Sequence, residues 1–239
     1  MKEHSAGRPL AGSEQLQVVL SLVLDRVAAV NPEPEYRLVG TAAALIQGVP
    51  LATGDIDILV ARRSDVDSFA AALSGFLCRI PPTWLPDARQ YFARFDVDGT
   101  DVEISTVEWP TDSDTLECAG PGPWQHYVPV KVGQHVVPAV RLELRLVSEL
   151  GRDRPDRYGP LIRHLRLHGA DLDLVLRAMP ERGVAPALQA WVVEQLRGTV
   201  ALLQQVVGDG DGAVEVAAVR SAEPDPVAVD LAGDRAAPG

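Results

Sequence analysis

The sequence predicts an α/β (α+β) fold in which a small mixed sheet with flanking helices is followed by a C-terminal helical lobe. Helix-like and strand-like segments alternate along the first third of the chain, and two hairpin patterns follow them. From Pro138 onward, apolar residues recur at helical spacing. We therefore expect a flexible N-terminus (1–13), a core (14–137), a helical lobe (138–207) and a disordered acidic tail (208–239).

The composition indicates a soluble globular protein with an acidic surface. Apolar residues make up 46% of the 239 residues, which is enough for a sizeable core. The formal net charge is −11, and the region after Val207 alone holds seven acidic residues and two arginines. That region is also rich in glycine, alanine and proline, so it cannot bury enough surface to order itself. General binding to nucleic acid duplexes is not expected, because such binding depends on neutralising phosphates.

Cysteine usage and hydropathy favour a cytoplasmic protein. Cys78 and Cys118 are the only cysteines and lie far apart, which argues against a disulfide scaffold or a zinc site. The opening ten residues lack the apolar segment of a signal peptide. The apolar run 16–30 is interrupted by Asp25-Arg26 and is too short to cross a bilayer, so no membrane role is expected.

The first three elements are a helix, a strand and a short helix. An apolar stripe predicts a helix over Ser13–Val30. The β-prone run Tyr36–Val39 stops at Gly40, and Ala42–Gln47 has the pattern of one or two helical turns. We expect Thr41 to be the N-cap of that helix and Gly40 to leave its free backbone N–H groups open to a ligand. Such a helix start suits a phosphate group.

A second strand, Asp55–Val60, places two carboxylates on one face. Asp55 and Asp57 point away from Ile56, because side chains alternate along a strand. Two residues span about 6.6 Å of strand, so both carboxylates can converge on one or two divalent ions. Ions such as Mg²⁺ prefer oxygen ligands and are often shared with substrate phosphates. Asp55, Asp57 and the preceding helix start therefore form a coherent candidate site.

A helix and a hairpin are expected next. The pattern predicts a helix from Ser64 to about Phe76, and Pro81-Pro82 is expected to end this segment. Arg89–Val97 and Thr100–Val107 form a hairpin whose two-residue loop is Asp98-Gly99. The register of the hairpin follows from this loop.

Two acidic residues on the hairpin are candidates for a third carboxylate. In the expected register Asp101 and Glu103 share the polar face, and Arg94 lies opposite Glu103. Parity alone leaves both acids open. Glu103 lies further from the exposed turn, so we prefer it.

The rest of the chain has the pattern of a second hairpin and a set of helices. The hairpin is expected over His126–Val137 around Gly133. One helix is expected along a stripe formed by Leu142, Leu146 and Leu150. Three further helices are expected over Tyr158–Leu167, Asp171–Met179 and Pro186–Val206.

Gly40-Thr41, a gap of thirteen residues and Asp55-Ile56-Asp57 resemble the signature of the polymerase-β-type nucleotidyltransferase superfamily. That family also has a third acidic residue on a later strand between apolar residues, and Val102-Glu103-Ile104 matches this pattern. The resemblance covers residues 15–176 and is closest to small bacterial members, which include antibiotic-modifying enzymes and abortive-infection toxins.

The resemblance implies a chemistry and its catalytic residues. A nucleoside monophosphate would pass from an NTP to a hydroxyl of a small molecule, an RNA end or a protein, with release of pyrophosphate. Asp55, Asp57 and Glu103 would be catalytic and would hold Mg²⁺ or Mn²⁺. Because three neighbouring carboxylates repel one another, we expect the metal to raise the stability of the protein.

Contacts with the triphosphate and the acceptor are less closely defined by the sequence. Gly40 and Thr41 would contact the triphosphate, and Arg62 and Arg63, which follow the acidic strand, are further candidates. The helical lobe is locally basic, which slightly favours an anionic or macromolecular acceptor. The leucine stripe is expected to turn three of its arginines at least partly outward: Arg141, Arg145 and Arg152.

Two other functions are alternatives to an active nucleotidyltransferase. A catalytically inactive nucleotide-binding or interaction module on the same fold would keep the same carboxylates. A glycosyltransferase that binds a nucleotide-sugar through its Asp-x-Asp motif is disfavoured, because only 54 residues precede Asp55 and a nucleotide-binding α/β region would need more.

Overall fold

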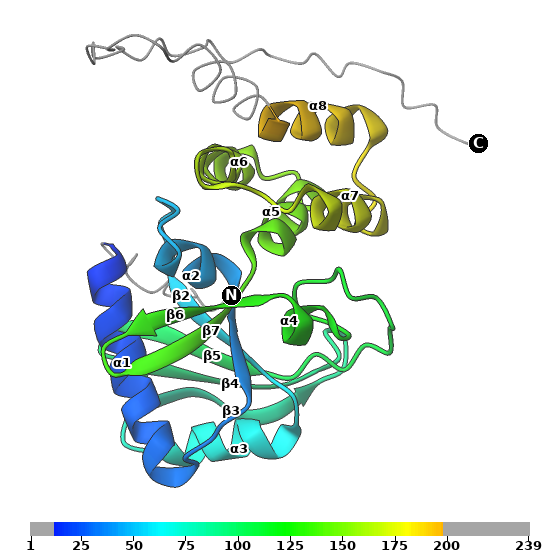
Figure 1. Cartoon of the computed structure of the whole chain (residues 1–239). Coiled ribbons are helices and arrows are strands. Elements are labelled where there is room, and N and C mark those ends of the chain that lie inside the picture. The colour runs from blue at the N-terminus through cyan, green and yellow to red at the C-terminus, as the bar shows by residue number, and fades with distance from the viewer. Residues whose placement is uncertain (1–11, 198–239) are drawn as a thin grey trace, which may run out of the picture.

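A mixed sheet of seven strands is the centre of the computed structural model, which describes residues 12–197 (Figure 1). In chain order the elements are α1 (Ser13–Val30), β1 (Tyr36–Val39), α2 (Gly40–Ile46), β2 (Asp55–Val60), α3 (Arg63–Ala72), β3 (Leu77–Leu85), β4 (Gln90–Val97), β5 (Thr100–Ser105), α4 (Gly122–Gln125), β6 (Tyr127–Val132), β7 (His135–Val140), α5 (Leu142–Gly151), α6 (Pro155–His168), α7 (Leu172–Glu181) and α8 (Pro186–Arg197). The strand order is β3-β4-β5-β2-β1-β7-β6. The predicted fold class, a mixed sheet with flanking helices followed by further helices, is confirmed.

The middle of the sheet combines both kinds of strand pairing. β2 runs antiparallel to β1 and parallel to β5, and β1 runs parallel to β7. Central strands are covered on both faces, so β1 is buried throughout. Figure 1 shows α1 and α3 along one side of the sheet and α5 to α8 gathered on the side of α2. The end of β1, where it runs into α2, and the acidic start of β2 therefore lie on the side of the helical lobe.

One apolar core joins the sheet to the helices. The apolar stripe of α1 is fully buried, and the stripe of Leu142, Leu146 and Leu150 on α5 belongs to the same core. Within residues 12–197, no helix is long and apolar enough to cross a membrane.

The hairpin register predicted around Asp98-Gly99 is confirmed. Val97 pairs with Thr100, Asp96 with Asp101, and Arg94 with Glu103. Asp98 and Gly99 both have positive φ angles, as a tight two-residue turn requires.

The expectation that Pro81-Pro82 ends its segment is wrong. β3 continues through both prolines and pairs with β4 as an edge strand. Its register shifts between Cys78 and Ile80 and again between Ile80 and Thr83. An edge strand needs hydrogen bonds on one side only, so it tolerates prolines and irregular pairing that a central strand would not.

The helical region begins later than the sequence predicts. Pro138 still belongs to β7, which runs to Val140, because Ala139 pairs with Leu38 of β1 and completes the parallel contact. The first helix of the lobe, α5, starts at Leu142. The last predicted helix is seen as α8 as far as Arg197; the expected acidic tail and most of the expected flexible N-terminus lie outside the described residues.

Candidate active site

Four acidic residues lie side by side on the two parallel strands β2 and β5. The register places Asp55 next to Asp101 and Asp57 next to Glu103. All four are partly exposed, whereas the residues between them are buried on the other face. Neighbouring strands are about 4.8 Å apart, so Asp55, Asp57 and Glu103 lie near one another on one face of these two strands. Asp101 shares the face and stays the alternative to Glu103.

The crowding of these carboxylates affects their pKa values. Burial raises the pKa of Asp57 to about 8, and the negative charges of Asp55 and Glu103 add to the effect. Burial also raises the pKa of Glu103, although Arg94 offsets part of the shift. Asp57 therefore responds to Glu103 as a close electrostatic neighbour. A cation bound between them would relieve this repulsion.

The donors have the chemistry that Mg²⁺ prefers, but Glu103 already has a partner. Its carboxylate forms an ion pair with Arg94, which lies opposite it in the hairpin. In the part of the chain that the structure describes, no group of three or more histidine, cysteine, aspartate or glutamate side chains is arranged so that it could hold a metal ion. A cation at Asp55 and Asp57 would have to compete with Arg94 for Glu103.

Gly40 is a close backbone neighbour of Asp57. Its φ angle is +71°, a left-handed conformation that glycine adopts without strain. A Cβ atom at this position would overlap the Oδ2 atom of Asp57. Glycine is therefore required here for two reasons, and the second is specific to the carboxylate. The sequence predicted space for a phosphate, whereas the structure shows space occupied by Asp57.

Thr41 does not cap the helix, which corrects the prediction. α2 begins at Gly40 and its N-cap residue is Val39, so Thr41 lies inside the first turn. Its buried hydroxyl instead accepts hydrogen bonds from Arg145 Nη2 and Arg157 Nη1, both at 3.2 Å. The N–H of Gly40 donates to Glu117 Oε1 at 3.0 Å.

Arg62 and Arg63 lie away from the carboxylates. They follow the far end of β2, and Arg62 is five residues beyond Asp57, which is about 16 Å of strand. Arg62 pairs with Asp65, whereas Arg63 pairs with Glu108. The structure therefore does not bring these arginines to the predicted site, because they follow the end of β2 opposite to the one that carries Asp55 and Asp57.

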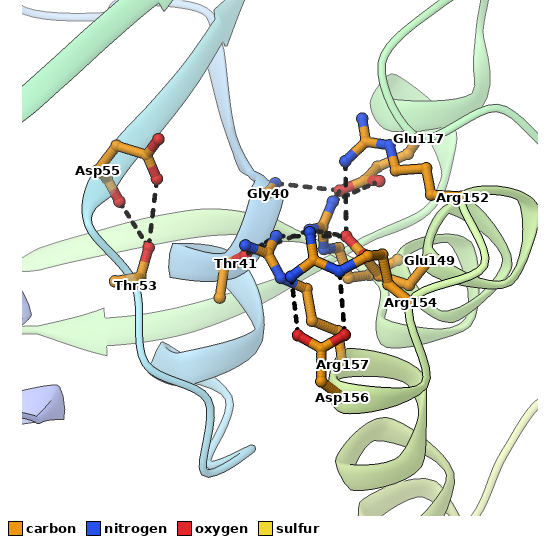
Figure 2. A network of polar contacts seen from close by, with 11 residues as sticks. Gly40, Thr41, Thr53, Asp55, Glu117, Glu149, Arg152, Arg154, Asp156 and Arg157 are labelled. Atoms are coloured by element: carbon orange, nitrogen blue, oxygen red, sulfur yellow. Dashed lines mark hydrogen bonds and ion pairs between the residues drawn. The ribbon is translucent and has the colours of Figure 1, made fainter. Parts of the chain in front are cut away.

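A buried charged network at the helical lobe was missed. Figure 2 shows Glu117 and Glu149 beside Gly40 and Thr41, with Arg152, Arg154 and Arg157 around them. Arg145, expected to turn at least partly outward, is only 3% exposed. One signal is present in the sequence: Arg145 and Glu149 are spaced i,i+4, which places them next to each other on one helix. Their burial is visible only in the structure, where α5 is buried from Leu142 to Leu150.

Comparisons with known proteins match solved structures but no protein-family model and no curated sequence. Among solved structures, a proposed nucleotidyltransferase from Thermotoga maritima is 20% identical, covers 69% of this chain and 98% of its own, and has a TM-score of 0.45. An antigenic nucleotidyltransferase-like protein from Paracoccidioides brasiliensis is 17% identical, with 84% and 92% covered and a TM-score of 0.40. The antibiotic-resistance factor ANT(2'')-Ia is 13% identical, with 82% and 96% covered and a TM-score of 0.39.

Proposed function

We propose that this protein is a metal-dependent nucleotidyltransferase, which moves a nucleoside monophosphate from an NTP to an acceptor hydroxyl and releases pyrophosphate. The observation that supports this most strongly is the parallel register that sets Asp57 beside Glu103, with Asp55 two residues away on the same face. Three carboxylates placed so closely repel one another, which favours a role in binding cations over a structural role.

The proposed roles follow from the position of each residue. Asp55, Asp57 and Glu103 would hold Mg²⁺ or Mn²⁺, which when bound would neutralise phosphate charge and lower the pKa of the acceptor hydroxyl. Gly40 lies beside Asp57, and Gly40 and Thr41 are proposed to contact the triphosphate. The donor and the acceptor would be oriented by this end of the sheet, and orientation supplies much of the rate in such transfers.

The arginines next to Thr41 support an anionic acceptor such as an RNA end. Arg152 and Arg157 lie 3.5 and 3.7 Å from the buried carboxylate of Glu149, which also pairs with Arg145. Three guanidinium groups therefore share this one carboxylate. The Arg152 side chain is 62% exposed and can bind a further anion. A cationic acceptor would be repelled from this side of the site.

One observation favours a second candidate, the catalytically inactive nucleotide-binding module. The ion pair between Arg94 and Glu103 engages the third carboxylate. If Arg94 keeps Glu103, the remaining pair Asp55 and Asp57 could bind a nucleotide with its metal and still fail to activate an acceptor.

Incubation with α-labelled NTPs and Mg²⁺ or Mn²⁺ tests the proposal. We expect pyrophosphate release and a labelled acceptor from the wild-type protein, and neither from Asp55→Ala or Asp57→Ala, which should remain folded in thermal melts. NTP binding without pyrophosphate release would support the inactive module. Unchanged turnover in either variant would exclude a metal site at these carboxylates.

A further inference from the structure

A buried ion-pair network joins the helical lobe to the turn at Gly40. Glu117 lies in the connection between β5 and α4 and is 1% exposed, while Arg145 and Glu149 lie one turn apart on α5 and are 3% and 0% exposed. Arg145 Nη1 donates to both carboxylate oxygens of Glu117, at 3.2 and 3.1 Å. Its Nη2 atom pairs with Glu149. Burying so much charge is costly unless every partner is in place.

The same network ends on the backbone that touches Asp57. Glu117 Oε1 accepts the N–H of Gly40, and Arg145 Nη2 donates to the hydroxyl of Thr41. Gly40 in turn lies so close to Asp57 that a single added carbon would overlap its carboxylate. Glu117 thus holds the backbone on which the position of Asp57 depends. Burial alone would raise the pKa of Glu117, but the charge of Arg145, the hydroxyl of Ser148 and the N–H of Gly40 together outweigh it and hold this pKa below its usual value.

A second ion pair, which is partly buried and lies at the start of α5, provides a comparison. Glu143, 5% exposed, accepts hydrogen bonds from Arg141 and from the backbone N–H of Asp171. These contacts join α5 to the start of α7 and do not involve the turn at Gly40. An ion pair can therefore join helices of the lobe without any contact to Gly40.

We propose that Glu117, supported by Arg145, is a positioning residue that holds Gly40 against Asp57 and so sets the geometry of the carboxylates for nucleotidyl transfer. This inference rests on the proposed function. Glu117 does not touch substrate in this role. It acts through one backbone hydrogen bond, and its effect is expected in the chemical step and in cation affinity more than in NTP binding.

Two conservative variants separate positioning from charge. Glu117→Gln keeps an acceptor for the N–H of Gly40 but loses the charge that faces Arg145. Glu117→Asp keeps the charge but withdraws the carboxylate from Gly40 by one methylene. Glu143→Gln is the control, since it weakens the partly buried ion pair of Arg141 and Glu143 at the start of the same helix, which has no contact with Gly40.

The measurements are Mn²⁺ affinity by calorimetry, kcat and KM for the NTP, and the melting temperature. We expect Glu117→Asp to lower kcat and Mn²⁺ affinity by at least about tenfold, the loss typical of groups that orient metal ligands, with KM changed less than about threefold. Glu117→Gln should stay closer to wild type in kcat and in Mn²⁺ affinity, and Glu143→Gln should lower only the melting temperature.

The outcomes separate this inference from the proposed function. Equal effects of the two Glu117 variants, or a larger loss in Glu117→Gln, would show that the network acts through charge or stability and would overturn the positioning role. A wild-type protein that binds Mn²⁺ but transfers nothing would remove the proposed reaction, while the Mn²⁺ affinities of the variants would still decide the positioning. A wild-type protein that binds no Mn²⁺ would overturn both.

Discussion

Asp57 combines burial with two negative neighbours, and this has a consequence for stability. Its pKa is about 8 in the folded protein and 3.8 for the unperturbed group, so between these values the folded state holds a proton that the unfolded chain has lost. Stability of the metal-free protein should therefore fall as the pH rises from about 4 to about 8 and then level off. The change should exceed about 1.4 kcal/mol, the equivalent of one pKa unit.

Thermal melts of metal-free protein across this pH range measure the effect. Asp57→Asn should remove most of the pH dependence and melt higher than wild type at pH 8, and Mg²⁺ should recover stability in wild type only. Asp101→Asn is the control on the same face. If the melting temperature changes with pH by the same amount in wild type and Asp57→Asn, Asp57 is not the group that causes the pH dependence.

The third carboxylate can be assigned by comparing Glu103 with Asp101. Glu103 lies beside Asp57 in the register and raises its pKa, whereas Asp101 lies beside Asp55 nearer the turn. Glu103→Gln should lower kcat by more than about 100-fold, or about 2.7 kcal/mol in barrier height, and Asp101→Asn by less than about threefold. Single-turnover rates with labelled NTP check this, and the reverse ranking would make Asp101 the ligand.

At the level of elements, the junction of β1 and α2 depends on Gly40. Gly99 is a matched control, because its φ angle is also positive, at +82°, and a Cβ there would meet nothing within 4 Å. Alanine should cost about 1–2 kcal/mol at either position for the left-handed backbone. Only Gly40→Ala should cost more and weaken Mn²⁺ binding, because its Cβ displaces Asp57.

A double-mutant cycle isolates that contact. In an Asp57→Ala background, where the carboxylate is gone, Gly40→Ala should cost little more than Gly99→Ala. Urea unfolding of the four proteins in the cycle gives the coupling free energy. A Gly40→Ala penalty that is the same with and without the Asp57 carboxylate would show that the glycine serves the backbone alone.

Local patterns predicted some elements well and failed at others for identifiable reasons. The Asp98-Gly99 loop fixed the hairpin register, and so the positions of Arg94 and Glu103, because a two-residue turn leaves no freedom. β3 was missed because prolines usually interrupt strands and only its edge position permits them. Thr41 was misassigned as a cap because the sequence does not show that Gly40 adopts a positive φ angle and opens the helix.

At the scale of the whole molecule, the fold class was predictable and the joint between core and lobe was not. Alternating apolar patterns report burial within each element. They do not report which distant charges meet. Glu117 and Arg145 are 28 residues apart, and Glu117 lies in a connection without regular structure. Only the folded chain shows that the lobe reaches the turn beside Asp57.

The charge of the lobe gives a prediction about the acceptor. Arg152→Glu with Arg154→Glu should weaken binding of a single-stranded RNA end, because both side chains are exposed near Thr41 (Figure 2). The slope of log affinity against log salt should fall by about 1.4, because each phosphate that is no longer neutralised lowers it by about 0.7. Arg163→Glu with Arg166→Glu changes the net charge equally at exposed positions of α6 and is the control. Equal losses of affinity from both pairs would indicate a general charge effect and no acceptor site.

Calorimetric titration of Mn²⁺ into wild-type protein and Asp57→Asn, each with and without NTP, tests the carboxylate centre most directly. We expect wild type to bind Mn²⁺ more tightly when NTP is present, because a shared cation joins the carboxylates to the phosphates. Asp57→Asn should lose at least about tenfold in Mn²⁺ affinity while remaining folded. Equal Mn²⁺ affinity in the two proteins, with or without NTP, would contradict a cation site at Asp55, Asp57 and Glu103.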